Sequence, residues 1–139
     1  MNERQKIVNL VDKEDNYKLD DLKDIVAVLR SDIGCPWDRK QTLESMKKCL
    51  ADETQEVFDA IDNKDMDNLC EELGDVLLQV VMNCQLASED NKFTLEDVIN
   101  GVSKKLIRRH PHVFGDEEPA KTEEEALARW QAMKAKERK

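Results

Sequence analysis

Apolar residues recur along most of this chain at intervals of three and four, the spacing that places side chains on one face of an α-helix. The pattern predicts helices over residues 19–31, 42–61, 66–88 and 94–110, and a last helix that begins at Thr122. Runs that alternate between apolar and polar residues are missing, and the sequence holds only 4 Gly and 3 Pro. We therefore expect an all-α fold, a helical bundle of about five helices.

The segments between these helices are short or rich in turn residues. Residues 34–38 (Gly-Cys-Pro-Trp-Asp) indicate a turn-rich break, and residues 112–121 indicate a loop. Only residues 63–65 separate the second helix from the third, so we expect these two helices to be antiparallel neighbours. The largely polar residues 1–18 are expected to form a flexible N-terminal leader, and residues 19–139 a single domain.

Two carboxylate pairs interrupt the apolar faces of the second and third helices. Glu53 and Glu56 form one pair, and Glu72 and Asp75 form the other. Residues three apart share one face of a helix, so each pair projects its two carboxylates together. If the helices are antiparallel neighbours, the pairs can face each other and offer four oxygen ligands of the kind that Mg²⁺ or Mn²⁺ prefers.

The same pairs have a second interpretation without a metal. The chain contains 31 acidic residues, so pairs at this spacing also arise by chance. Buried carboxylates can be neutralised by lysines, and Lys47, Lys48 and Lys64 lie nearby in the sequence. A di-iron bundle is disfavoured because it needs Glu-x-x-His motifs, and neither histidine lies on these helices.

A basic cluster ends the predicted fourth helix, at Lys104, Lys105, Arg108 and Arg109. Cations there complement the negative end of the helix dipole. They can also donate to the oxygens of a bound phosphate. Beyond this cluster, Trp130 fits either a buried contact or a stacking platform for a nucleobase.

Charge and cysteine content narrow the class of protein. A net charge of −9 argues against a general nucleic-acid binder or a protein of anionic membranes, because both need a basic surface. The four cysteines show no C-x-x-C spacing, and we expect them to be thiols in a reducing compartment. Neither a membrane span nor a signal peptide is recognisable, so we expect a cytoplasmic protein.

Several motifs together resemble one known family. The run Cys35-Pro-Trp-Asp38 followed by Gln41-Thr42 resembles the opening of MazG-type nucleoside triphosphate pyrophosphohydrolases. Asp52-Glu-Thr-Gln-Glu56 and Glu72-Leu-Gly-Asp75 resemble that family's E-E-x-x-E and E-x-x-D metal motif. Lys105-Leu-Ile-Arg-Arg-His-Pro-His-Val-Phe-Gly115 is similar to a further segment. The motifs agree in order and spacing over roughly residues 19–135, nearly the whole chain.

The resemblance implies an all-α, usually dimeric enzyme that hydrolyses a nucleoside triphosphate to the monophosphate and pyrophosphate with Mg²⁺, for which Mn²⁺ can substitute. It implies metal ligation by Glu53, Glu56, Glu72 and Asp75. It also implies substrate-binding residues, with phosphates held by Lys105 and Arg109 and the nucleotide site completed by Trp130 and Lys134.

Two departures from the family pattern bear on the reaction. Asp52 stands where the motif usually has its first Glu, one methylene longer. Glu53 or Asp52 is the candidate catalytic group for orienting the attacking water. Family members also often carry two copies of this domain, and this sequence has one.

Two alternatives to this interpretation remain at this point. One is a non-enzymatic acidic helical module that binds a partner protein. The other keeps the fold and metal and changes the substrate, for example to a pyrimidine deoxynucleotide or an alarmone.

Overall fold

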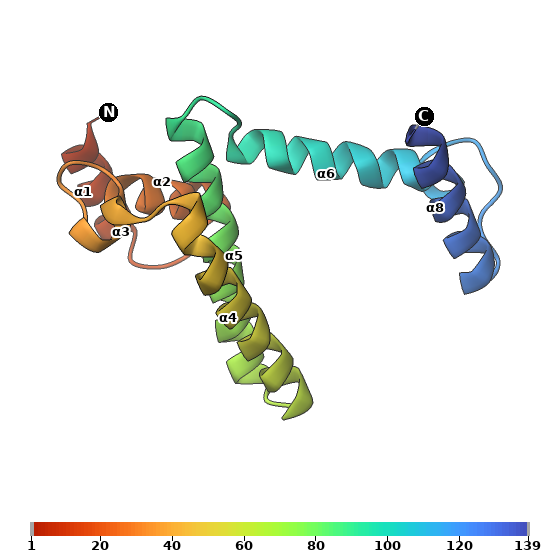
Figure 1. Cartoon of the computed structure of the whole chain (residues 1–139), viewed down its shortest axis with the longest axis horizontal. Helices are drawn as coiled ribbons and strands as arrows, with labels where there is room; N and C mark the ends of the chain where they lie inside the picture. The colour runs from red at the N-terminus through yellow and green to blue at the C-terminus, as the bar shows by residue number, and fades with distance from the viewer. Residues whose placement is uncertain (1, 139) are drawn as a thin grey trace. The chain divides into compact units, whose positions relative to one another are not determined.

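The computed structural model describes residues 2–138, and over this range it is all-helical (Figure 1). Its helices are α1 (Glu3–Lys13), α2 (Leu19–Leu29), α3 (Pro36–Lys40), α4 (Leu43–Asp62), α5 (Met66–Glu89), α6 (Leu95–Arg109), α7 (Pro111–Phe114) and α8 (Glu123–Glu137). They fall into two compact units, Met1–Leu95 and Glu96–Lys139. The all-α prediction is confirmed, whereas the expected number of about five helices is wrong, because residues 2–138 form eight.

The additional helices lie where the sequence suggested breaks or a leader. Both α3 and α7 begin at a proline, Pro36 and Pro111, whose missing N–H is no loss at the first helical position. Helix α1 forms within the expected leader. Its first turn is capped by Asn2, whose side chain accepts from the Gln5 backbone N–H at 2.8 Å.

Helices α4 and α5 form an antiparallel hairpin and lie side by side (Figure 1). Thr42 caps α4 by accepting from the backbone N–H of Ser45 at 3.1 Å. Asp65 caps α5 by accepting from the backbone N–H of Asn68, also at 3.1 Å. Between the helices, Lys64 adopts a φ of 55°, which lets the chain reverse within a few residues. The prediction of antiparallel neighbours is thereby confirmed.

The hydrophobic core of the first unit lies toward one end of this hairpin. It combines residues of α2, the first half of α4, the second half of α5 and the start of α6: Val26, Met46, Val81, Met82, Cys84, Leu86 and Leu95. Burying such side chains stabilises the fold by roughly 1.5–3 kcal/mol each. The other half of the hairpin carries the acidic pairs.

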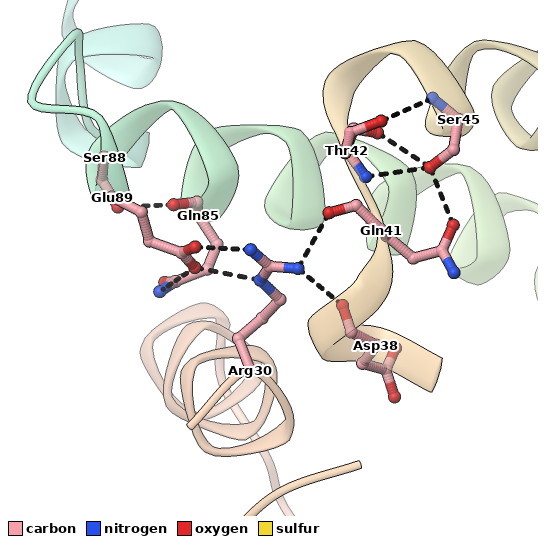
Figure 2. Close-up of polar contacts among 8 residues, drawn as sticks. All are labelled: Arg30, Asp38, Gln41, Thr42, Ser45, Gln85, Ser88 and Glu89. Carbon is pink, nitrogen blue, oxygen red and sulfur yellow. Dashed lines mark hydrogen bonds and ion pairs between the residues drawn. The ribbon is translucent and has the colours of Figure 1, made fainter. Parts of the chain in front are cut away.

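Arg30, directly after α2, joins three segments of the first unit (Figure 2). Its Nε and Nη2 donate to the Glu89 carboxylate at 3.0 and 2.5 Å, at the end of α5. Its Nη1 donates to the backbone carbonyls of Asp38 at 2.6 Å and Gln41 at 3.0 Å. The arginine therefore fixes the chain that leads into α4 against the end of α5.

The second unit is formed by α6, α7 and α8. Thr122, where the sequence predicts the start of the last helix, caps α8 by accepting from the backbone N–H of Glu125 at 3.1 Å. Two arginines at the end of α6 form ion pairs with Glu137 at the end of α8. No helix within residues 2–138 is long and apolar enough to cross a membrane.

Candidate functional site

Four carboxylates converge between α4 and α5. Glu53 and Glu56 project from α4, and Glu72 and Asp75 project from α5. One oxygen of each can be chosen so that all four oxygens lie within 4.8 Å of one another. The short connection between the helices brings the two i, i+3 pairs together, so the sequence-based expectation of their convergence agrees with the structure.

The convergence of negative charge shifts the protonation of two of these groups. The pKa of Glu72 is raised to about 7, first by a hydrogen bond shared with Glu56, then by burial and the nearby charges of Glu56, Asp75 and Glu53. The pKa of Glu53 is also raised, first by burial and then by the charges of Glu56 and Asp75. Without a counter-charge, the cluster favours holding a proton.

No cation of the protein neutralises the cluster within residues 2–138. Lys48 pairs with Asp52 at 2.8 Å, and Lys47 pairs with Glu44 at 3.3 Å. Ion pairs with the four clustered carboxylates are absent from this part of the chain, so the lysine-neutralised interpretation is not supported.

Two buried oxygens fit a metal ion directly. Oε2 of Glu53 and Oε2 of Glu72 are shielded from solvent, and neither has a hydrogen-bond partner in the described part of the chain. A buried carboxylate oxygen left without a donor costs free energy, which a coordinated cation offsets. An all-oxygen donor set of carboxylates is the chemistry that Mg²⁺ and Mn²⁺ prefer.

Asp52 lies apart from this convergence. Its side chain is 58% exposed and forms its ion pair with Lys48, one helical turn earlier. Its charge reaches the cluster only as a minor contribution to the raised pKa of Glu53. Of the two candidates for orienting a water, Glu53 is the one whose carboxylate lies within the cluster.

The second unit brings together two of the predicted substrate-binding residues. The guanidinium carbon of Arg109 lies 4.8 Å from the centroid of the Trp130 ring, in cation–π geometry. The Arg109 side chain is only 12% exposed. Its partner is Glu137, which also accepts from Nε of Arg108. The basic cluster thus has an internal carboxylate that neither interpretation of the sequence included.

Lys105 and Lys134 stand one helical turn from these residues. Lys105 precedes Arg109 by four residues on α6, and Lys134 follows Trp130 by four residues on α8, so each shares a face with its neighbour. Lys134 lines a surface cavity of about 360 Å³ together with Gln131, Ala135 and Arg138. Neither lysine forms an ion pair in the described part of the chain.

Sequence reasoning overlooked a polar side chain on the same stripe as the acidic pair of α5. Gln79 follows Glu72 by seven residues and Asp75 by four, is 7% exposed, and has an Oε1 atom without a partner among residues 2–138. Its signal was available in the sequence, since Gln79 interrupts the apolar run from Val76 to Met82. Glu137 was also overlooked, and nothing distinguishes it from the other charged residues near the C-terminus.

Comparison with known proteins places these features in a family. A model of the MazG nucleotide pyrophosphohydrolase domain matches residues 41–114. The chain is 50% identical, over 91% of its length, to a Thermotoga maritima protein named nucleoside triphosphate pyrophosphohydrolase/pyrophosphatase MazG. It is 45% identical, over 87% of its length, to the nucleoside triphosphate pyrophosphohydrolase of Escherichia coli K12. These alignments cover 48% and 46% of the two relatives.

A solved structure supports the same relationship. The crystal structure of a mazG-related protein from Thermotoga maritima matches with a TM-score of 0.70 and 33% sequence identity. The match covers 84% of this chain and 99% of that one. The chain therefore resembles the whole of the solved protein, but it spans less than half the length of the two curated relatives above.

Proposed function

Because this chain belongs to the MazG nucleotide pyrophosphohydrolase family, we propose that it hydrolyses nucleoside triphosphates to nucleoside monophosphates and pyrophosphate with Mg²⁺. The observation that carries the proposal is the acidic cluster, in which oxygens of four carboxylates lie within 4.8 Å of one another. Two of the carboxylates hold a buried oxygen without a donor. These features fit a divalent cation and a phosphate-bearing substrate.

In this proposal the four clustered carboxylates of α4 and α5 hold the metal, which is Mg²⁺ or Mn²⁺. A bound metal would supply charge neutralisation at the triphosphate and lower the pKa of a bound water. Glu53 orients the attacking water and accepts its proton. It suits that role because its carboxylate lies within the cluster that would hold the metal, whereas Asp52 lies apart from it.

The second unit carries the further substrate-binding residues that the family resemblance implies. Following the family resemblance, Lys105 and Arg109 bind the β and γ phosphates, where their charges stabilise the departing pyrophosphate. Trp130 and Lys134 complete the nucleotide site. The half-buried Trp130 already contacts Arg109, so one aromatic surface and one guanidinium are held together in advance of the substrate.

We also propose that the protein forms a homodimer. Helix α5 carries a stripe of exposed apolar side chains, Met66, Leu73, Leu77 and Val80, of which Met66 is 60% exposed. Met66, Leu73 and Val80 repeat every seven residues, the spacing with which one helix packs along another. This stripe is distinct from the face that carries Glu72 and Asp75, so a second copy could cover it without displacing the acidic cluster.

The reaction is tested by identifying products. We expect the protein, incubated with each of the common NTPs and Mg²⁺, to release nucleoside monophosphate and pyrophosphate, measured by anion-exchange chromatography and ³¹P NMR. Chelation by EDTA should abolish the release, and Mn²⁺ should restore part of it. Release of orthophosphate and the diphosphate would refute the assigned reaction.

The same assay addresses substrate choice. We propose a role in clearing non-canonical nucleotides or in controlling nucleotide pools, and the two roles make different demands on specificity. A screen that includes modified NTPs, pyrimidine deoxynucleotides and an alarmone should show a preference of tenfold or more in kcat/KM for damaged bases if the role is clearance. Comparable kcat/KM values across ordinary NTPs would favour control of nucleotide pools.

A further inference from the structure

A carboxylate at the end of α8 engages the basic end of α6. We propose that Glu137 is a positioning residue that holds the Arg109 guanidinium against the Trp130 indole and keeps one edge of it available for substrate phosphate. The inference rests on the proposed function, in which Arg109 binds phosphate. It adds a residue that lies outside the motifs of the sequence.

The hydrogen bonds define which edge is held. Nε of Arg109 donates to Oε2 of Glu137 at 2.9 Å, and Nη2 donates to the same oxygen at 2.7 Å. The second carboxylate oxygen, Oε1, accepts from Nε of Arg108. Glu137 thus grips the Nε–Nη2 edge of Arg109, and this contact leaves the two N–H donors of Nη1 unengaged.

The face of the guanidinium is held as well. The Arg109 guanidinium carbon lies 4.8 Å from the Trp130 ring centroid. Trp130 itself packs against His110, whose ring centroid is 5.2 Å away at an interplanar angle of 53°. Nδ1 of His110 lies 2.6 Å from the backbone carbonyl oxygen of Leu106. An edge contact and a face contact together leave the Arg109 guanidinium little freedom to rotate.

The combined charge of Arg108, Arg109 and Glu137 remains suited to binding an anion. Two arginines share one carboxylate, so the three side chains carry a net charge of +1. Their hydrogen bonds lower the pKa of Glu137 to about 2, with Arg108 as the first cause and Arg109 as the second. Glu137 therefore stays ionised, and keeps its hold on both arginines, at any pH at which a phosphohydrolase would be assayed.

The position of the Glu137 carboxylate favours a role in holding Arg109 over competition with substrate phosphate. A carboxylate that mimicked phosphate would have to leave before substrate could use the same donors. Here one oxygen serves the Nε–Nη2 edge, and the other serves a different arginine. An arginine fixed in advance loses less rotamer entropy on binding, so removing Glu137 should weaken substrate binding by about 2- to 10-fold.

The test combines kinetics with a direct measure of Arg109. We expect Glu137→Ala to raise KM for NTP by about 2- to 10-fold, with kcat changed less than about twofold. The hydrogen exchange of the Arg109 Nε–H, followed by ¹⁵N–¹H NMR and assigned with Arg109→Lys, should accelerate by at least about tenfold. Glu137→Asp, which retains the charge, should recover part of both effects.

Glu125→Ala is the matched control. Glu125 lies on the same helix, and the contacts described for it involve Lys121, Thr122 and Arg129 rather than Arg109, so its loss should leave KM and the Arg109 exchange unchanged. A lower KM in Glu137→Ala would show that the carboxylate competes with phosphate and would overturn the inference. So would an unchanged exchange rate of the Arg109 Nε–H, or faster exchange with an unchanged KM.

The two proposals can fail separately. If the unaltered protein releases no pyrophosphate from any NTP, the proposed function is refuted, and with it the phosphate that Arg109 is held for. If the unaltered protein is active and Glu137→Ala binds substrate equally well, only the positioning role of Glu137 is refuted.

Discussion

At the scale of single residues, environment separates carboxylates that are alike in sequence. Glu53 and Glu72 have raised pKa values because burial and neighbouring carboxylates disfavour their charged forms. Glu137 has a pKa lowered to about 2 because two arginines donate to it. The sequence pattern found the first group from its i, i+3 spacing. It could not find Glu137, whose role depends on where the end of α6 meets α8.

Glu72 makes the stability of the metal-free protein depend on pH. Its folded-state pKa of about 7 exceeds the ordinary 4.5, so the folded state binds its proton more tightly than the unfolded state does. The free energy of unfolding should therefore fall as pH rises from about 4.5 to about 7. In EDTA, Glu72→Gln should flatten this slope and raise the melting temperature at pH 8.

Glu71, the sequence neighbour of Glu72, provides the control for this prediction. Glu71 is exposed on α5 and lies outside the cluster, so Glu71→Gln should keep the slope of the unaltered protein. Added Mg²⁺ should raise the melting temperature of the unaltered protein and of Glu71→Gln, because a ligand of the folded state stabilises it. It should raise that of Glu72→Gln much less. Equal metal responses in all three proteins, followed by calorimetry, would contradict the metal site.

At the scale of elements, helical spacing predicted the long helices well. Thr42, Asp65 and Thr122 cap helices close to the expected starts, because short polar side chains satisfy the exposed N–H groups there. The prolines misled. Pro36 and Pro111 suggested breaks, and each instead begins a short helix, because the missing N–H of a proline is no loss at the first helical position.

Arg30 connects several of these elements through its hydrogen bonds and ion pair. The Arg30 side chain is 10% exposed, and Arg30→Gln removes its ion pair with Glu89 and its hydrogen bonds to two backbone carbonyls. We expect the free energy of unfolding to fall by about 2 kcal/mol, since hydrogen bonds to charged groups contribute about 1.5–3 kcal/mol. Urea denaturation followed by circular dichroism measures the change.

Arg39→Gln provides the comparison. Arg39 is exposed and donates to the backbone carbonyls of Ser31 and Asp32. Its loss should reduce the free energy of unfolding by less than about 0.5 kcal/mol. A similar loss in both variants would mean that the contacts of Arg30 do not organise this part of the fold.

At the scale of the whole molecule, the apolar stripe on α5 is a feature that a single chain leaves unexplained. A stripe of this kind costs solubility unless something covers it. We expect sedimentation velocity to show a dimer, and Leu77→Glu, in the centre of the stripe, to weaken dimerisation at least about tenfold by introducing a charge into an apolar contact.

Val11→Glu is the matched substitution elsewhere. Val11 is an exposed apolar residue on α1, outside the stripe, so its replacement should leave the dimer intact. A monomer for the unaltered protein across micromolar concentrations would refute the dimer. We expect metal binding to persist even if the protein is a monomer, because all four carboxylates come from one chain.

The turn at Lys64 has a consequence for how the acidic cluster assembles. Of the residues between Glu56 and Glu72, all but 63–65 belong to α4 or α5, so the entropic cost of bringing the two carboxylates together is met when the two helices pair. A cation would therefore bind to carboxylates that the paired helices already hold close together. Exchange of one ion for another should then proceed without any rearrangement of the rest of the protein.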